Sequence, residues 1–313
     1  MQNKLQIYLT APDKNVLSQC VIIKTPNNKI VVVDGGHLEF EPCLAPAIRG
    51  ILGLKDDEYF EIEAWFISHA HGDHYGELVK MFNGAEKNTN FKVNNIYFDF
   101  PIFENTTLHD FEPKFLQMYK DALDNYAKMH GIDCNGSCYD YLNGKVINRE
   151  SVEKGLTITI DGVPFDILQT HADVDEQVNA NSTVIRIRFE SQDGLKKVLI
   201  LNDVSELSGD RLVEKYGDEL KSDIVQLSHH GQMGAKKSTY DVIDAKIRLW
   251  PTPYWVWTQP ERFKIGEVRD WFNLSENGGS PCDLVACLYD EYPEDRTKAE
   301  DWAKCVHKMM VEI

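Results

Sequence analysis

The sequence contains no apolar run long enough to span a bilayer, and its start, MQNKLQIYLTAPDKN, lacks the apolar core of a signal peptide. It has no lysine- or arginine-rich stretch either. Its 50 acidic and 33 basic residues give a formal net charge of −17, whereas a long nucleic acid needs a basic binding surface. We therefore expect a cytoplasmic protein whose partner is a small molecule, with neither a membrane nor a long nucleic acid as partner.

Paired cysteines and a serine-nucleophile motif are missing as well. The seven cysteines are an odd number without disulfide-like spacing, which indicates reduced thiols. Cys134 and Cys138 are the closest pair, but no further ligands stand near them to complete a zinc knuckle. The motif Gly-x-Ser-x-Gly does not occur, so the sequence gives no support to a serine hydrolase of that class.

Apolar residues are abundant, and no linker interrupts them. Hydrophobic residues make up 42% of the 313 residues, which is enough for a large packed core. We therefore expect a single domain over residues 1–313. Segments rich in β-branched residues predict strands at 5–10, 20–25, 29–36 and 63–69.

Strands and helices alternate along the rest of the chain. Residues 85–150, with helical spacing over 111–131, are expected to form a helical spacer or a lid. Asp-Gly dipeptides at 161–162 and 193–194 predict turns between paired strands, and a helix is predicted over 209–220. This rhythm predicts an α/β fold, a four-layer αββα sandwich of two sheets with outer helices.

Four side chains of metal-ligand type lie within one short stretch, SHAHGDHYGE: His69, His71, Asp73 and His74. An apolar strand precedes the stretch and a helix is predicted over 76–82, so the cluster lies on a strand-to-helix loop. The first two histidines can bind one metal ion, and the Asp-His pair, turned at Gly72, can face a second. These donors suit two divalent ions, with zinc as the first choice and manganese or iron as alternatives.

The motif His-x-His-x-Asp-His after an apolar strand resembles the signature of the metallo-β-lactamase superfamily, and its other motifs stand in the family's order. By this resemblance Asp34, in VVVDGG, supports the ligand loop without binding metal. Asp203, in LILNDVSE, bridges the two ions. VQLSHHGQ supplies the last ligand, from His229 or His230; we expect His229, with His230 in a supporting or substrate-binding role. The resemblance implies the metallo-β-lactamase fold over nearly the whole chain.

Within the superfamily, the sequence looks most like the hydrolase domain of the competence protein ComEC, through HHG and the stretch NANSTVIRIRF. Asn202 departs from the family, which has glycine before the bridging aspartate. His171, after an apolar segment, is either the third histidine of the first metal or a loop histidine. Asn181 and Ser182 are expected to fix a loop, and Tyr75 to pack or to donate to a developing oxyanion.

Two divalent ions that share a water make hydroxide near neutral pH, so the sequence predicts a dinuclear metal hydrolase. Asp73 would orient that hydroxide and receive its proton. The ComEC resemblance favours a small phosphodiester or nucleotide-like substrate, and a lactone, thioester or amide is the alternative. A metal-binding module with little or no turnover is the second hypothesis. The aromatic run LWPTPYWVWTQP either packs in the core or lines the substrate pocket.

Overall fold

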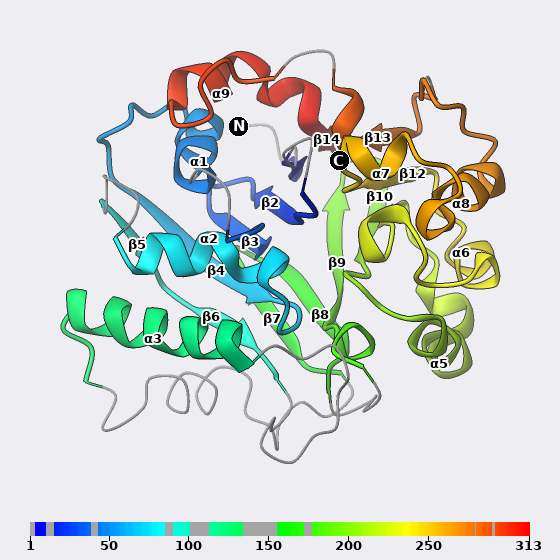
Figure 1. Cartoon of the computed structure of the whole chain (residues 1–313), viewed down its shortest axis with the longest axis horizontal. Coiled ribbons are helices and arrows are strands. Elements are labelled where there is room, and N and C mark those ends of the chain that lie inside the picture. The colour runs from blue at the N-terminus through cyan, green and yellow to red at the C-terminus, as the bar shows by residue number, and fades with distance from the viewer. Residues whose placement is uncertain are drawn as a thin grey trace.

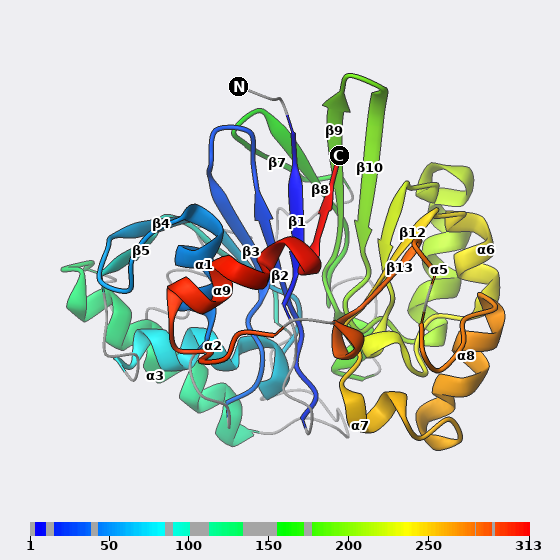
Figure 2. The same cartoon turned by 90° about the horizontal axis from the view of Figure 1, so that it is seen from above.

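Two mixed sheets stand face to face in the computed structural model, with helices on both outer sides (Figure 1, Figure 2). The structure describes residues 4–10, 16–38, 43–84, 90–100, 113–133, 155–171, 177–278, 280–289 and 292–313. Within these residues each sheet has seven strands. The predicted four-layer αββα sandwich is confirmed.

The first sheet contains the N-terminal half of the chain and its last strand. Its strands are β1 (Gln6–Leu9), β2 (Cys20–Lys24), β3 (Ile30–Asp34), β4 (Phe60–Ile67), β5 (Phe91–Val93), β6 (Ile96–Phe98) and β14 (Met310–Glu312). They lie in the order β14-β1-β2-β3-β4-β5, and β6 also pairs with β4. Because β3 and β4 are parallel, the residues that follow both strands leave the sheet at the same end.

The second sheet contains the other half of the chain. Its strands are β7 (Thr157–Ile160), β8 (Val163–Gln169), β9 (Val184–Ser191), β10 (Gly194–Ile200), β11 (Ile224–Gln226), β12 (Ile247–Trp250) and β13 (Asp283–Val285), in the order β13-β12-β11-β10-β9-β8-β7. The β7–β8 hairpin turns at Asp161 and Gly162, whose φ angles of 53° and 77° suit the predicted two-residue turn. β10 and β11 are parallel, so their following loops also leave at one end.

Alternating side chains build apolar layers on both faces of each sheet. On β3, Val31 and Val33 belong to the layer between the sheets, whereas Ile30 and Val32 belong to the layer under the helices. The helices of the first sheet are α1 (Leu44–Leu52), α2 (Gly72–Phe82), α3 (Pro113–Met129) and α9 (Ala299–Cys305). Those of the second are α5 (Glu206–Tyr216), α6 (Lys237–Ile243), α7 (Tyr254–Trp257) and α8 (Ile265–Trp271).

Some boundaries differ from the prediction. α2 begins at Gly72, inside the ligand cluster, because its first turn carries polar ligands that hide the apolar spacing. α5 begins at Glu206, since Ser205 caps its amino end. The sequence did not predict α1 or β14. Of the expected spacer or lid over residues 85–150, residues 85–89, 101–112 and 134–150 lie outside the described residues. No helix among the described residues is long and apolar enough to cross a membrane.

Candidate metal centre

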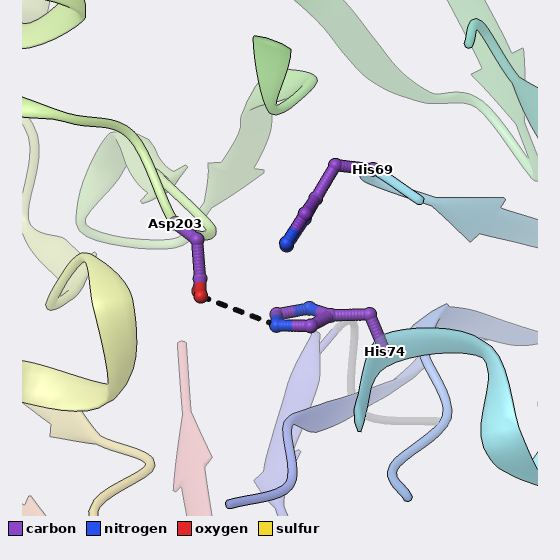
Figure 3. A group of neighbouring side chains, drawn as sticks. All are labelled: His69, His74 and Asp203. Atoms are coloured by element: carbon purple, nitrogen blue, oxygen red, sulfur yellow. Dashed lines mark ion pairs between the residues drawn. The ribbon is translucent and has the colours of Figure 1, made fainter. Parts of the chain in front are cut away.

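The candidate metal centre lies where loops from the two sheets meet. After β4 the chain reaches His69, and the first turn of α2 carries His74. From the second sheet, the chain after β10 brings Asp203 to the same place. Figure 3 shows these three side chains pointing toward one another, with an ion pair between His74 and Asp203. Residues from both halves of the chain therefore share one site.

Two overlapping groups of side chains could each hold a metal ion. The first group is His69, His74 and Asp203, and the second is Asp73, His74 and His230. The candidate ligand atoms within each group lie within 4.8 Å of one another. Because His74 belongs to both groups, the two candidate sites are adjacent.

His74 is held in place by Asp34. Its Nδ1 lies 2.7 Å from Oδ2 of Asp34, and this oxygen also accepts from Oγ of Ser68 at 2.9 Å. The other oxygen, Oδ1, accepts from the backbone N of Ser68 at 2.8 Å. Asp34 has a φ of 60°, a left-handed conformation that aspartate tolerates better than most residues. With Nδ1 engaged, the nitrogen left to coordinate a metal is Nε2, which lies 3.3 Å from Oδ2 of Asp203.

His69 is buried between the two sheets and contacts hydroxyl groups from both. Its Nδ1 lies 2.9 Å from Oγ of Ser68 and 3.2 Å from Oγ of Ser182. Its Nε2 lies 3.1 Å from Nδ1 of His71. Burial, together with the neighbouring imidazoles, lowers the pKa of His69 well below its ordinary value. A neutral imidazole at neutral pH follows, which is the form that binds metal.

Charge attraction keeps the carboxylates of the centre ionised. Burial opposes ionisation of Asp203, but attraction to His74 and His230 outweighs it and holds the Asp203 pKa well below its usual value. The same balance lowers the pKa of Asp73. Burial also opposes a charge on His74, yet attraction to the surrounding carboxylates raises its pKa well above the ordinary value. A positive charge is thus favoured among these carboxylates.

Buried ligand atoms of the centre lack hydrogen bonds of good geometry among the residues that the structure describes. They include Nε2 of His74 and Oδ1 of Asp203. An unpaired buried polar atom costs about 1–3 kcal/mol, so such atoms are expected to have a partner in the functional protein. Imidazole and carboxylate donors suit zinc, manganese and iron. The donor set therefore fits two divalent metal ions.

Asn202, which precedes Asp203, combines strain with additional hydrogen bonds. Its φ is 53°, in the left-handed region that glycine and asparagine tolerate. Its Nδ2 donates to the carbonyl of Thr183, and its backbone N donates to Oε1 of Gln226, both at 2.6 Å. Its Oδ1 accepts from Nε2 of Gln19 at 2.7 Å. These bonds hold a backbone conformation that glycine would adopt without strain.

Of the two histidines after β11, His230 lies in a candidate ligand group. Its side chain is buried, and its Nε2 lies 3.1 Å from Oδ2 of Asp73. His229, the expected ligand, has Nε2 3.9 Å from Asp203 and 3.4 Å from the amide of Asn179. Both histidines have positive φ angles, 50° and 59°, and this left-handed turn directs the second one inward. The geometry thus favours His230 over His229.

His171 follows β8 and contacts an acidic residue from the other sheet. Its Nδ1 lies 2.7 Å from Oδ2 of Asp99, which is buried and follows β6. Among the described residues, His171 is in neither group of candidate metal ligands. Its role as the third histidine of the first metal stays a prediction.

Two further candidates lie near the cluster in sequence or space. Tyr75 is fully buried in the core under α2, with its ring centroid 5.2 Å from that of Tyr119. This position agrees with the packing interpretation, and the donor role of Tyr75 toward an oxyanion stays a prediction. Asn181 lies in a short 3-10 turn, where its Nδ2 donates to the carbonyl of Gln177 at 2.6 Å and fixes that loop.

An open cavity of about 330 Å³ lies beside the ligands of the first sheet. His71 and Asp73 line one part of it, and the rings of Phe115 and Trp255 line another. The rest of the aromatic run behaves differently, because Trp250 and Trp257 are buried in the core of the second sheet. The run therefore serves both packing and the cavity.

A second open cavity, of about 320 Å³, lies beside the ligands of the second sheet. Its lining includes Asp203, His229, Asn179 and Lys264. A larger cavity, of about 420 Å³, lies at the β7–β8 turn near Asp161 and contains none of the candidate ligands. A choice by volume alone would thus select a cavity without candidate metal ligands. We consider the two smaller cavities, which candidate ligands line, to be the functional candidates.

Sequence reasoning missed the contacts that several polar residues make with the candidate ligands or their neighbours: Gln19, Ser68, Asp99 and Ser182, the last of which was expected only to fix a loop. Ser68 directly precedes His69, and this adjacency could have identified it. The others give no local signal, since Ser182 is 113 positions from His69 and Gln19 is 183 positions from Asn202.

Comparison by sequence matches one segment of the chain to a known family. Residues 14–84 match the family model described as the metallo-beta-lactamase superfamily. This segment contains Asp34 and the whole His-x-His-x-Asp-His cluster. None of the curated proteins matches the chain.

Solved structures with a similar fold share little sequence with this chain. CmlA, a diiron β-hydroxylase from Streptomyces venezuelae, is 13% identical with a TM-score of 0.45, over 86% of this chain and 52% of CmlA. Yeast PDE1 is 13% identical with a TM-score of 0.43, over 85% of this chain and 94% of PDE1. MEM-A1, a subclass B3 metallo-beta-lactamase from a soil metagenome, is 13% identical with a TM-score of 0.37, over 96% of this chain and 92% of MEM-A1.

The chain spans about half the length of the CmlA structures it matches. At 13% identity and TM-scores below 0.5, these structures say nothing about the activity or ligands of this chain. Residues 14–84 are therefore similar to the metallo-beta-lactamase superfamily, and the sandwich of two mixed sheets with flanking helices is consistent with the fold of that superfamily.

Proposed function

We propose that this chain is a hydrolase that uses two divalent metal ions and acts on a small phosphodiester or nucleotide-like substrate. The observation that carries the proposal is the pair of candidate ligand groups that share His74. Zinc is our first choice of metal, with manganese and iron as alternatives, because all three accept imidazole and carboxylate ligands.

Residues of both sheets would hold the two ions: His69, His71, Asp73, His74, Asp203 and His230, with His171 as a further candidate. When bound, two such ions polarise the substrate and make water nucleophilic near neutral pH. The protein's own part is to present these donors in the correct form. Asp34 fixes Nδ1 of His74, and burial keeps His69 neutral.

Asp73 is our candidate for the proton acceptor. Its side chain is 17% exposed and lines the cavity beside His71, whereas that of Asp203 is only 2% exposed. Nε2 of His230, 3.1 Å from Oδ2 of Asp73, holds the carboxylate in place. Asp73 can therefore orient an attacking water in the open cavity. A proton that its carboxylate receives would pass on to solvent there, because the lowered pKa of Asp73 favours release of the proton.

The linings of the two cavities support a phosphodiester with an aromatic substituent. Phe115 and Trp255 offer rings on which a base can stack. In the other cavity, Lys264 can attract a phosphate oxygen; its Nζ is 3.9 Å from Glu206, a loose pair. The motifs HHG and NANSTVIRIRF favour the ComEC-like branch and the same substrate class. Because Phe115, near the start of α3, lines the first cavity, we propose that α3 contributes one wall of the substrate site.

The test combines a metal count with hydrolysis of bis-p-nitrophenyl phosphate. We expect two metal ions per chain and measurable hydrolysis, both lost in His69→Ala. His307→Ala, which changes an exposed histidine, should leave metal content and rate unchanged. Hydrolysis of lactones, thioesters or amides alone would change the substrate class. Bound metal without turnover of any of these would favour the metal-binding module, and absence of metal would contradict the proposal.

A further inference from the structure

Gln19 is a fully buried polar residue that contacts both halves of the candidate metal centre. It directly precedes β2 of the first sheet. Its backbone N donates to the carbonyl of Asp73 at 3.2 Å, and its carbonyl accepts from the backbone N of Gly36 at 2.9 Å. These two bonds fix the Gln19 backbone between the loop after β3 and the start of α2.

The side chain of Gln19 reaches from this position to the second sheet. Its Nε2 donates to Oδ2 of Asp34 at 3.2 Å and to Oδ1 of Asn202 at 2.7 Å. Its Oε1 accepts from Nε2 of Gln226 at 3.0 Å. One side chain thus joins the carboxylate that holds His74 to the residue that precedes Asp203.

The direction of these hydrogen bonds is fixed. If the Gln19 amide were reversed, its oxygen would face the Asp34 carboxylate and its NH₂ would face the NH₂ of Gln226. Asn202 cannot reverse either, because its Nδ2 donates to the carbonyl of Thr183. Since all these groups are buried, each lost bond would leave an unpaired polar atom. The network therefore has one stable arrangement.

We propose that Gln19 is a positioning residue that sets the spacing between the two halves of the metal centre. The apolar layer between the sheets, which includes Val31 and Ile187, resists separation of the two sheets. Apolar contacts are not directional, so this layer does not fix how one sheet is oriented relative to the other. Metal ligands require distances correct to about 0.2 Å, which directional hydrogen bonds can supply. This role rests on the proposed metal centre and concerns the His74 and Asp203 ligands.

The experiment measures cobalt binding to the full chain and to Gln19→Met, which keeps the length of the side chain but removes its hydrogen bonds. Cobalt affinity is determined by competition with a chelator, and the visible absorption of the bound cobalt reports ligand geometry. We expect affinity to fall about 10- to 100-fold, the usual effect of losing a residue that orients ligands, with a changed spectrum. Val198→Ala, in the apolar layer between the sheets, is the control for general loss of stability.

Asn202→Gly is a second variant, because glycine accepts the left-handed backbone but removes the acceptor for Gln19. It should also bind cobalt more weakly, even if Gln19→Met does not fold. If the folded variants keep the cobalt affinity and the spectrum of the wild type, the role of Gln19 is overturned. The role is also overturned if Val198→Ala loses as much cobalt affinity as the two variants do. A wild-type chain that binds no cobalt, zinc, manganese or iron would overturn the proposed function itself.

Discussion

Asp34 selects which nitrogen of His74 can bind a metal. It accepts from Ser68 and lies 2.7 Å from Nδ1 of His74, so Nε2, which lies 3.3 Å from Oδ2 of Asp203, is the nitrogen left for a metal ion to bind in place of its proton. The tautomer of a ligand histidine is set by such a partner. The chemistry of the centre therefore depends on a carboxylate that is itself no ligand in the arrangement we propose.

Replacing Asp34 with Asn should switch this tautomer. The Asn amide would donate to Nδ1, which moves the proton of His74 to Nε2 and removes the lone pair needed for a metal. We expect zinc affinity to fall about 10- to 100-fold, measured by calorimetry. The side-chain shape is kept, so we expect unfolding in urea to change by no more than about 3 kcal/mol. Unchanged zinc affinity would contradict the role of Asp34.

At the residue scale, the sequence predicts site residues that lie close together in the chain. The residues from His69 to His74 could be predicted as metal ligands because several ligand types lie in one short loop. Gln19 and Asp99 contact residues that are distant in sequence, and no local pattern marks them. The choice between His229 and His230 depends on a left-handed turn, which the sequence HHG does not specify.

The start of α2 is the element on which the centre depends. Its Gly76 lies directly against the loop after β3, and the N of Gly76 donates to the carbonyl of Gly36 at 2.7 Å. A Cβ atom at this position would meet the carbonyl carbon of His37 at 2.3 Å and the backbone N of Leu38 at 2.4 Å. Backbone atoms cannot move aside cheaply, so only glycine fits here.

Gly76→Ala should displace α2 and, with it, Asp73 and His74. We expect a loss of about 1–3 kcal/mol in stability, typical of overpacking, together with weaker zinc binding. Gly53→Ala is the control, since a Cβ there meets nothing within 4 Å and only its φ of 70° is unfavourable. It should cost about 1 kcal/mol and leave zinc affinity unchanged. Equal zinc affinity in both variants would contradict the account of α2.

A second prediction at this scale concerns Asp166 of β8, whose carboxylate accepts hydrogen bonds from Arg186 and Arg188 of β9. Burial would raise the pKa of Asp166, but hydrogen bonds from Arg188, Thr157 and Arg186 hold it below its ordinary value. Its contribution to stability is therefore present above the unfolded-state pKa, about 3.9, and is lost as the pH falls through the lower folded-state pKa.

Asp166→Asn should lower the free energy of unfolding at pH 7 by about 1–2 kcal/mol, a value reduced for the exposure of Arg188. The difference between wild type and variant should narrow below about pH 4, as measured by urea unfolding. A constant difference down to pH 2.5 would show that the carboxylate charge contributes nothing.

For the whole molecule, the strand rhythm and apolar content predicted the sandwich, because alternation reports which residues face a core. The start of α2 was misplaced because ligands replace apolar residues in its first turn. β14 was not predicted, since its pairing with β1 joins the two ends of the chain. Pairings between distant segments depend on tertiary packing, which cannot be predicted from the spacing of apolar residues in the sequence.

Removal of metal should destabilise the whole molecule, because the centre concentrates Asp73, Asp203 and their histidine partners between the two sheets. A ligand at 1,000 times its Kd contributes about 4 kcal/mol to stability. We therefore expect a chelator to lower the thermal unfolding temperature by several degrees and zinc to restore it. An identical unfolding temperature with and without chelator would argue against a metal held between the sheets.

The most direct test of the central claim is the number of metal ions per chain in wild type and in His74→Ala, measured by elemental analysis after zinc saturation and gel filtration. His74 belongs to both candidate ligand groups. The account predicts two ions in the wild type and fewer than two in the variant, because Nε2 of His74 can bind one ion and its loss leaves one of the two groups incomplete. A wild type without stoichiometric metal, or a variant that still holds two ions, would contradict it.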